Sequence, residues 1–423
     1  MSSRPLPAGF DRLETPVYLY DLDELRASHT RLRAALPSQT QLYYSLKANP
    51  HPSVVTKLRT LGCLAEVCSP GELRTALEAG FAAAGVLYTG PGKREQDLVD
   101  AVKAGVELFS VDSPHGLDQL DTVARRLTVS LQALIRINDD APAPGQRMTM
   151  TGVASQFGAD AAWVLAEPAR FGPRGAVRPV GFHLYMGSNI VGRDALLAQF
   201  RQAAATAARL AGATGIQVRL LDLGGGFGAP FARVGELPPL DGLDAGIEEL
   251  LDGTFPGWRD GRPAVTFESG RYLTATCGTL LTRVLDVKQS HGRAVIVLES
   301  GVNHLGGLSG LRRLPPIVPD LVWDVGGPAT EPVETIVAGP LCTPVDTWAR
   351  AAPLPAVAPG QLVRVPNVGA YGLNASLVAF LGHPLPAEAT VEAGRITNVS
   401  RVELLRQTVT DASRGDQQWI PAS

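Results

Sequence analysis

Short apolar segments alternate with amphipathic ones from about residue 40 to residue 275, and this alternation most constrains the fold. Eight segments have the length and composition of buried β-strands, namely 41–48, 64–69, 86–91, 107–113, 131–138, 180–188, 219–228 and 264–270. The segments between them have the period of a helix, and several end in glycine, which commonly stops helices. Eight strands that alternate with helices predict a (β/α)8 TIM barrel, an α/β fold, with an open doubly wound sheet as the alternative.

The chain is too long for this barrel alone, and its pattern changes near residue 275. Its 423 residues exceed one ordinary domain core. The part after 275 has the pattern of β-strands joined by Gly/Pro turns, and the start of the chain contains a strand that leads into a helix. We therefore predict a barrel over 31–275 and a C-terminal β-sandwich or β-barrel domain over 276–423, which the N-terminal strand within 1–30 joins.

Composition and charge exclude several classes of function. The net charge of −3 provides no positive field for nucleic acid or anionic membranes. No apolar run reaches the roughly 18 residues that a membrane span needs, and the first residues lack the apolar region of a secretion signal. The four cysteines have no zinc-site spacing. We therefore expect a cytoplasmic protein with free thiols, no metal site and no nucleic-acid or membrane partner.

Lys47 ends the first predicted barrel strand, within the sequence YYSLKANP at 43–50. The carboxyl ends of barrel strands form the face on which active sites are built. A lysine among apolar neighbours loses its charge more easily, and a neutral amine is a nucleophile that forms a Schiff base with an aldehyde. The alternative is an ordinary lysine on the barrel rim whose amine reaches water.

Glycines and charged residues follow the last two predicted barrel strands. Gly224, Gly225 and Gly226 let backbone N–H groups approach an anion such as phosphate, although such clusters also form tight turns. Glu268 can pair with a protonated ring nitrogen and Arg271 with phosphate, or the two can belong to a structural ion-pair network. A Schiff-base lysine, a phosphate loop and an acidic partner for a ring nitrogen together indicate pyridoxal 5′-phosphate.

With these motifs the chain resembles the fold-type III pyridoxal-phosphate decarboxylases, which include the diaminopimelate, ornithine and arginine decarboxylases and share the alanine racemase-like architecture. The resemblance covers about residues 15–400. YYSLKAN is similar to the family's Y-A-x-K-A-N, which implies that Lys47 holds the cofactor. LAEVCSPGEL resembles F-D-x-x-S-x-x-E-L, with Glu66 where aspartate is common. FESGR resembles E-P-G-R and adds Gly270 to the cofactor-binding residues.

Two motifs of the C-terminal part extend the resemblance. GPLCTPVD at 339–346 resembles G-P-x-C-x-x-x-D, which in the family enters the active site of the partner subunit. The resemblance therefore implies a homodimer with shared sites, in which Cys342 is catalytic and Asp346 binds substrate. VGAYG at 368–372 resembles the G-A-Y motif, whose tyrosine, Tyr371 here, contacts the cofactor phosphate and borders the substrate.

The chain departs from the family pattern around the cofactor ring. GFHLYMGS at 181–188 resembles G-x-H-x-H-x-G-S, but Tyr185 replaces the histidine that stacks on the ring. Tyr185 can stack as an aromatic side chain, and Ser188 can still bind phosphate. His183 is either a cofactor-binding residue or a satisfied core histidine.

It also departs from the pattern where the family binds substrate. Thr343 stands where relatives that act on diamino acids often have an acidic residue, which argues against lysine, ornithine or meso-diaminopimelate as substrate. Arg312 and Arg313 are candidates for the arginine that binds a substrate carboxylate, with ordinary surface arginines as the alternative.

The activity that the resemblance implies is decarboxylation of an L-type α-amino acid, with Lys47 or Cys342 returning a proton to Cα. We expect a substrate whose tail is conjugated, as in relatives that act on siderophore precursors or carrier-protein-bound aminoacyl groups. An amino-acid racemase of the same fold and a non-catalytic homologue are the alternatives. Racemases lack G-P-x-C-x-x-x-D, and non-catalytic homologues tend to lose the lysine or the phosphate contacts.

Overall fold

The computed structural model describes residues 5–140, 148–149, 151–306, 318–323 and 331–407. One sheet closes into a barrel of eight parallel strands, because the order β5-β4-β3-β2-β12-β11-β9-β6 is completed by a pairing of β5 with β6. The barrel strands are β2 Gln41–Ser45, β3 Leu64–Val67, β4 Val86–Tyr88, β5 Leu108–Val111, β6 Leu131–Asn138, β9 Val177–His183, β11 Leu220–Asp222 and β12 Ala264–Ser269. The predicted (β/α)8 barrel is confirmed, and the open sheet is excluded.

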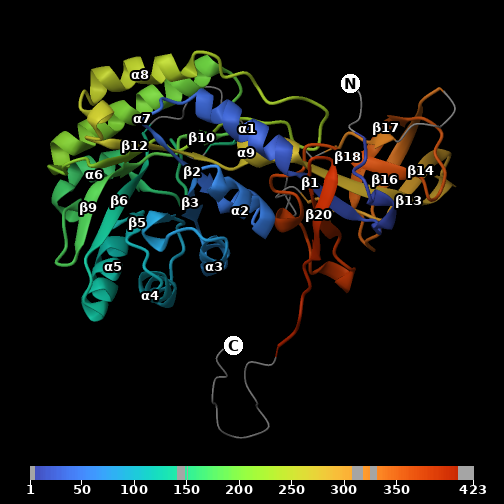
Figure 1. Ribbon diagram of the computed structural model, residues 1–423, viewed down its shortest axis with the longest axis horizontal. Helices are drawn as coiled ribbons and strands as arrows, with labels where there is room; N and C mark the ends of the chain where they lie inside the picture. The colour runs from blue at the N-terminus through green and yellow to red at the C-terminus, as the bar shows by residue number, and fades with distance from the viewer. Residues whose placement is uncertain (1–4, 141–147, 150, 307–317, 324–330, 408–423) are drawn as a thin grey trace, which may run out of the picture.

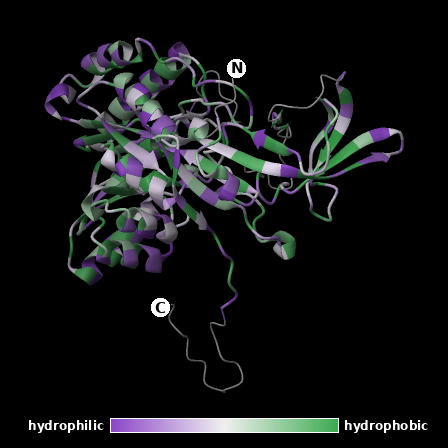
Figure 2. Ribbon diagram, turned by 45° about the vertical axis from the view of Figure 1, so that its right-hand side comes forward, coloured by the Kyte–Doolittle hydropathy of each residue, from purple (hydrophilic) through white to green (hydrophobic). Residues whose placement is uncertain are grey.

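Helices surround the barrel (Figure 1). Hydrophilic and hydrophobic residues alternate along them, as Figure 2 shows, so an apolar face of each can pack on the strands. Two of them begin at a serine whose Oγ accepts a backbone N–H three residues on, followed by proline at the first helical position. The α-helices are α1 Leu22–Ala34, α2 Pro52–Thr60, α3 Pro70–Glu78, α4 Glu95–Lys103, α5 Pro114–Leu127, α6 Ala161–Ala166, α7 Arg193–Thr214, α8 Leu243–Thr254 and α9 Arg271–Thr274. The 3₁₀ helices are η1 Phe10–Arg12, η2 Leu46–Ala48, η3 Ala83–Gly85, η4 Pro168–Phe171, η5 Trp258–Asp260, η6 Ala275–Cys277, η7 Leu373–Ala375 and η8 Phe380–Gly382.

The inside of the barrel has two layers that differ in polarity. The apolar layer is a cluster of Tyr43, Leu64, Leu87, Leu108, Leu134, Val180 and Leu220. Two residues further along each strand, or three on β9, comes a polar layer of buried side chains: Ser45, Glu66, Thr89, Ser110, Arg136, His183 and Asp222, with Glu268 on β12. Side chains alternate across a strand, so both layers point inward, while the residues between them pack outward in the main core. The polar layer therefore lies toward the carboxyl ends of the strands.

A second large sheet contains strands from both ends of the chain. Its order is β17-β16-β14-β13-β1-β19-β20, and β18 pairs with β13 and β15. The strands are β1 Val17–Asp21, β13 Gly278–Ser290, β14 Arg293–Leu298, β15 Val322–Trp323, β16 Val333–Ala338, β17 Thr347–Leu354, β18 Leu362–Val365, β19 Ala387–Glu392 and β20 Arg395–Arg401. β1 runs antiparallel to β13 and parallel to β19. The expectation that the N-terminal strand joins the C-terminal β-structure is confirmed.

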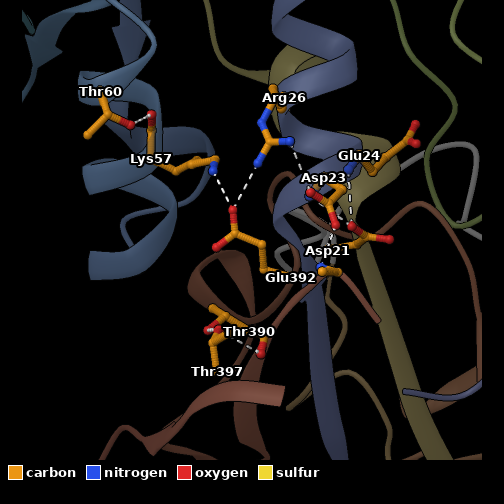
Figure 3. Close-up of polar contacts among 10 residues, drawn as sticks. Asp21, Asp23, Glu24, Arg26, Lys57, Thr60, Thr390, Glu392 and Thr397 are labelled. Carbon is orange, nitrogen blue, oxygen red and sulfur yellow. Dashed lines mark hydrogen bonds and ion pairs between the residues drawn. The ribbon is translucent and has the colours of Figure 1, made fainter. Parts of the chain in front are cut away.

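Charged side chains tie this second sheet to the barrel helices. Glu392, at the end of β19, accepts from Lys57 of α2 at 2.6 Å and from Arg26 of α1 at 2.9 Å (Figure 3). Asp21 caps α1 through the backbone N–H groups of residues 23 and 24, and the carboxylate of Asp23 accepts the N–H of Ala393 at 2.6 Å. Each exposed ion pair of this kind contributes little to stability. Together these contacts hold the β19–β20 hairpin against α1 and α2.

Short strands also occur in the loops above the barrel. β7 Met148–Thr149 pairs with β10 Gly187–Ser188, and β8 Ala159–Asp160 pairs with the end of β6. The segment that follows β6 thus returns to the rim of the barrel at both of these points. Within the described part of the chain, no helix has the length and hydrophobicity to cross a membrane.

Candidate active site

Lys47 lies just beyond the barrel strand that was expected to contain it. β2 ends at Ser45, and Lys47 is the middle residue of the 3₁₀ helix η2. Two hydrogen bonds to residues that follow β18 hold this turn. Asn374 Nδ2 donates to the Lys47 carbonyl at 2.8 Å, and Asn49 Nδ2 donates to the Gly369 carbonyl at 2.8 Å. The turn ends the strand and directs the lysine side chain over the mouth of the barrel.

The amine of Lys47 is paired with a buried carboxylate. Its Nζ lies 3.1 Å from Glu66 Oε2, and Glu66 also accepts from the Thr89 hydroxyl and from Cys68 Sγ, the latter at 3.1 Å. Burial by itself raises the pKa of Glu66, but Lys47 and the hydrogen bonds outweigh it and bring that pKa down to about 2. Burial likewise lowers the pKa of Lys47, but the carboxylate beside it leaves this pKa well above its ordinary value. The expectation that burial makes this amine neutral is therefore wrong for the protein without cofactor.

A second carboxylate in the polar layer lacks a full set of partners. His183 Nε2 lies 3.2 Å from Glu268 Oε1, without hydrogen-bond geometry, and neither atom has another partner among the described residues. On the other side of the ring, His183 Nδ1 lies 2.8 Å from Ser110 Oγ. Burial, and next the charge of Glu268, raise the pKa of Asp222 to about 7. A buried carboxylate with a free oxygen is what a protonated ring nitrogen requires as a partner.

The three glycines after β11 are required by close contacts. A Cβ on Gly225 would lie 2.0 Å from the Glu268 carbonyl oxygen, and one on Gly226 would lie 2.6 Å from that of Gly187. Gly224 has a φ of +63° and donates its N–H to Asp222 at 2.7 Å. The N–H groups of Gly225 and Gly226 have no hydrogen bond to any described residue. The loop therefore offers two free donors to a phosphate, as the sequence predicted.

Arginine and tyrosine side chains lie beside the Lys47 turn. Arg271 Cζ lies 4.8 Å from the centre of the Tyr371 ring, and the buried Nε of Arg271 has no hydrogen bond among the described residues. The backbone N–H of Tyr371 donates to Ala48 at 2.8 Å, which brings this tyrosine to the Lys47 turn. A Cβ on Gly270 would lie 2.7 Å from Ala48 Cβ, so glycine is needed where β12 passes the turn. The Tyr185 ring centre lies 5.9 Å from Lys47 Nζ.

The structure brings together most of the predicted cofactor-binding residues, but among the predicted substrate-binding ones only Tyr371 lies beside the Lys47 turn. Cys342 is exposed, and none of the contacts among described residues joins it to the polar layer. Thr343 lies in the same turn. The carboxylate of Asp346 is buried and accepts the N–H groups of Val302 and Leu341 at 2.8 and 2.7 Å, so in its own chain it fixes this loop. Arg312 and Arg313 lie outside the described residues.

Several residues of the site were not predicted from the sequence. They are Cys68, Thr89, Ser110, Arg136 and Asp222, and all but Cys68 belong to the polar layer. Cys68 lies two residues after Glu66 of the polar layer. Each of the other four lies two residues after a leucine of the apolar layer. That spacing was the available signal: a polar residue in register with Glu66 or Glu268 on a barrel strand faces the same cavity.

Comparison with known proteins places these residues in a family context. Residues 22–275 match the model of the pyridoxal-dependent decarboxylases, pyridoxal binding domain. The chain is 33% identical to the L-glutamyl-[BtrI acyl-carrier protein] decarboxylase of Niallia circulans, over 92% of each chain. It is 31% identical to the diaminopimelate decarboxylase of Methanothermobacter thermautotrophicus, over 97% of this chain and 93% of that one. The crystal structure of diaminopimelate decarboxylase from Helicobacter pylori with L-lysine has a TM-score of 0.79 at 26% identity, and covers 93% of this chain and 94% of that one.

Proposed function

The chain belongs to the pyridoxal-dependent decarboxylases, and from this premise we propose that it removes the α-carboxylate of an L-type amino acid whose distal end carries no free ammonium group. The observation that carries the site assignment is the polar layer with Lys47 at its edge: Lys47 is ion-paired with Glu66 and its Nζ lies 5.9 Å from the centre of the Tyr185 ring. The same layer holds Glu268, whose Oε1 lies 3.2 Å from His183 Nε2 but forms no hydrogen bond with a described residue.

The residues present fit pyridoxal 5′-phosphate. Lys47 would hold its aldehyde carbon, Glu268 its ring nitrogen and Tyr185 the face of its ring. The free N–H groups of Gly225 and Gly226, with Ser188, Arg271 and Tyr371, would hold the phosphate, and Gly270 leaves space for the strand to approach. When bound, the cofactor supplies an electron-accepting ring that takes up the electron pair left when CO2 departs.

The chain's own residues govern charge and protons around that centre. Glu268 is a buried carboxylate, so it would hold a proton on a ring nitrogen that faces it. Glu66 keeps a proton on Lys47 Nζ, because the pair is within 3.1 Å and its carboxylate is held by Thr89 and Cys68. In this state Lys47 would be a proton donor for Cα of the substrate.

A conjugated substrate is supported by two observations. Thr343 offers no charge to a distal ammonium, where many relatives that act on diamino acids have an acidic residue. In addition, the Niallia circulans relative is named for a carrier-protein-linked glutamyl substrate. We propose that the substrate of this chain is joined to a carrier protein or another group through its tail.

We further propose a homodimer with shared sites. Cys342 and Thr343 lie in an exposed turn that does not reach the polar layer of their own chain. In the partner arrangement of the family, the partner subunit's Cys342 would approach Cα as the second proton donor. The arrangement also gives Thr343 a contact with substrate.

The test of the activity is a visible spectrum followed by an assay of CO2 release. The purified protein should show an absorption band near ~420 nm that survives dialysis and that borohydride fixes to Lys47. CO2 should be released from a carrier-linked amino acid and not from free lysine, ornithine or meso-diaminopimelate. Lys47→Ala is the control; a reducible protein adduct in that variant would refute the assignment of Lys47.

The test of the dimer is complementation. Lys47→Ala and Cys342→Ala subunits, each inactive alone, should regain about a quarter of the activity when mixed, since one site of the mixed dimer has both residues intact. Recovery at no mixing ratio would show that each chain uses its own residues.

A further inference from the structure

Arg136 is a buried cation without an anionic partner. It follows Leu134 by two residues on β6 and so points into the barrel, where its exposed fraction is 8%. Its guanidinium forms neither a hydrogen bond nor an ion pair with any residue between 5 and 407 that the structure describes. The guanidinium lies against the ring of Phe157, whose centre is 4.8 Å from Cζ. A buried guanidinium keeps its charge, so it calls for an anion from outside the chain.

Lys93 lies on the same side of the barrel mouth, after β4. Its side chain is 10% exposed, and its Nζ donates to the Gly90 carbonyl and lies 3.8 Å from Asp112 Oδ2. Burial, opposed by Asp112 and reinforced by the charge of Arg136, lowers the pKa of Lys93 to about 8. The amine and the guanidinium are therefore close enough to repel each other.

The cluster has one carboxylate for two cations. Asp112 is shared, because its Oδ1 accepts the N–H of Gly158 at 2.7 Å while Oδ2 faces Lys93. With Lys93 protonated, the cluster therefore has a net charge of +1. One additional anion would neutralise it and relieve the repulsion between the cations.

The loop after β6 holds this arrangement in place. Gly158 has a φ of +75°, and a Cβ there would lie 2.6 Å from the Asn138 backbone nitrogen, so the loop lies directly on the end of β6. That contact holds Phe157 against one face of the guanidinium and leaves its N–H edge free. β9 separates β6 from β11, and β4 and β5 lie on the far side of β6 from the glycine loop.

On the premise of the proposed function, we propose that Arg136 and Lys93 bind a carboxylate of the amino-acid substrate. The planar guanidinium edge presents two parallel donors to the two carboxylate oxygens, and Lys93 adds a third donor. Two carboxylates could occupy the site: the one on Cα, or one at the distal end of the amino acid. The chemistry is the same, and matched ligands separate the two sources.

The test is equilibrium binding to the protein loaded with cofactor, followed by the change in cofactor absorbance. L-alanine against L-alaninamide reports on the α-carboxylate, and 4-aminobutyrate against 4-aminobutyramide on a distal one. In Arg136→Met, one of the two acids should bind at least about tenfold more weakly, with its amide unchanged. Lys93→Met should act in the same direction, and Arg136→Lys should restore part of the affinity.

A control and two contrary outcomes make the test decisive. Arg126→Met removes an exposed arginine paired with Glu95 and should change no affinity. Equal losses for acids and amides, or no loss at all, would overturn the proposal. So would a loss confined to retention of pyridoxal phosphate, since Arg136 would then serve the cofactor. Binding that discriminates acids from amides without CO2 release from any substrate would instead contradict the proposed function and leave the subsite standing.

Discussion

The apolar layer and the polar layer are built from the same strands, two or three residues apart, yet they have opposite roles. In the apolar layer, Leu87, Leu108 and Leu134 lie on the neighbouring strands β4, β5 and β6 and belong to one buried cluster. One step further toward the carboxyl ends, Glu66, Arg136, Asp222 and Glu268 bring four ionisable groups into the same interior. Burial favours apolar packing in the first layer and costs free energy in the second unless charges find partners. Stability therefore depends mainly on the apolar layer, and chemistry on the polar layer closer to the carboxyl ends of the strands.

The largest effect is expected from breaking the apolar layer. Leu134→Ala leaves a cavity among closely packed side chains, so we expect a loss of about 2–5 kcal/mol in the free energy of unfolding. Ser110→Ala in the polar layer removes one hydrogen bond to His183 and should cost only about 1 kcal/mol. Urea denaturation of the two variants measures the difference, and equal losses would contradict the division between the layers.

The next effect is on activity. Glu268→Gln keeps the shape of the side chain but removes the charge that faces the ring nitrogen, so kcat should fall on the order of 10²–10³-fold with the melting temperature nearly unchanged. Glu388→Gln is the matched control, because Glu388 is also buried and accepts from Tyr20 at 2.9 Å, far along the chain in the second sheet. Similar activity losses in both variants would remove the special role of Glu268.

The third effect is a dependence of stability on pH. The folded protein without cofactor raises the pKa of Asp222 to about 7, whereas the unfolded chain releases that proton near its ordinary value of 3.8. The folded state thus holds one more proton between these values, and its stability falls as pH rises through them, by up to about 1.4 kcal/mol per pH unit. Asp222→Asn should reduce this slope in denaturation curves recorded from pH 5 to 8. The slope that remains should come from Glu72, whose pKa burial also raises to about 7; an unchanged slope would assign the whole effect to groups other than Asp222.

The smallest effect concerns the support of Glu66. Thr89→Val removes a hydrogen bond that, after Lys47, helps to lower the pKa of Glu66, so this pKa should rise. The acid limb of the pH profile of kcat/KM should move to higher pH, and the rate should fall about tenfold or less. Thr89→Ser retains the hydroxyl and should restore the profile. A uniform loss of rate without a shift of the limb would make Thr89 a purely structural residue.

Much of this architecture follows from the sequence, but the partners within the site do not. The eight strands were predicted because buried parallel strands are short apolar runs between helices, and Lys47, Gly225 and Glu268 because they follow such runs. Arg136 and Asp222 were missed, although each lies two residues beyond a leucine of the apolar layer, because that spacing marks them only once the inward face of the strand is known. The 3₁₀ turn at Lys47 was missed for another reason: contacts from Asn374, more than three hundred residues away in the chain, hold it.

The central position of β1 has a consequence for how the molecule is made. Val17 pairs with Leu281 of β13 and with Ala387 of β19, so β1 is synthesised long before either of the strands that flank it. Until then the buried face of β1 is exposed, and closing so long a loop costs entropy before any contact compensates for it. The barrel strands, by contrast, mostly pair with neighbours close in sequence. A stalled or shortened chain that contains the entire barrel still displays an unpaired apolar strand, and it is such incomplete chains that aggregate or require a chaperone.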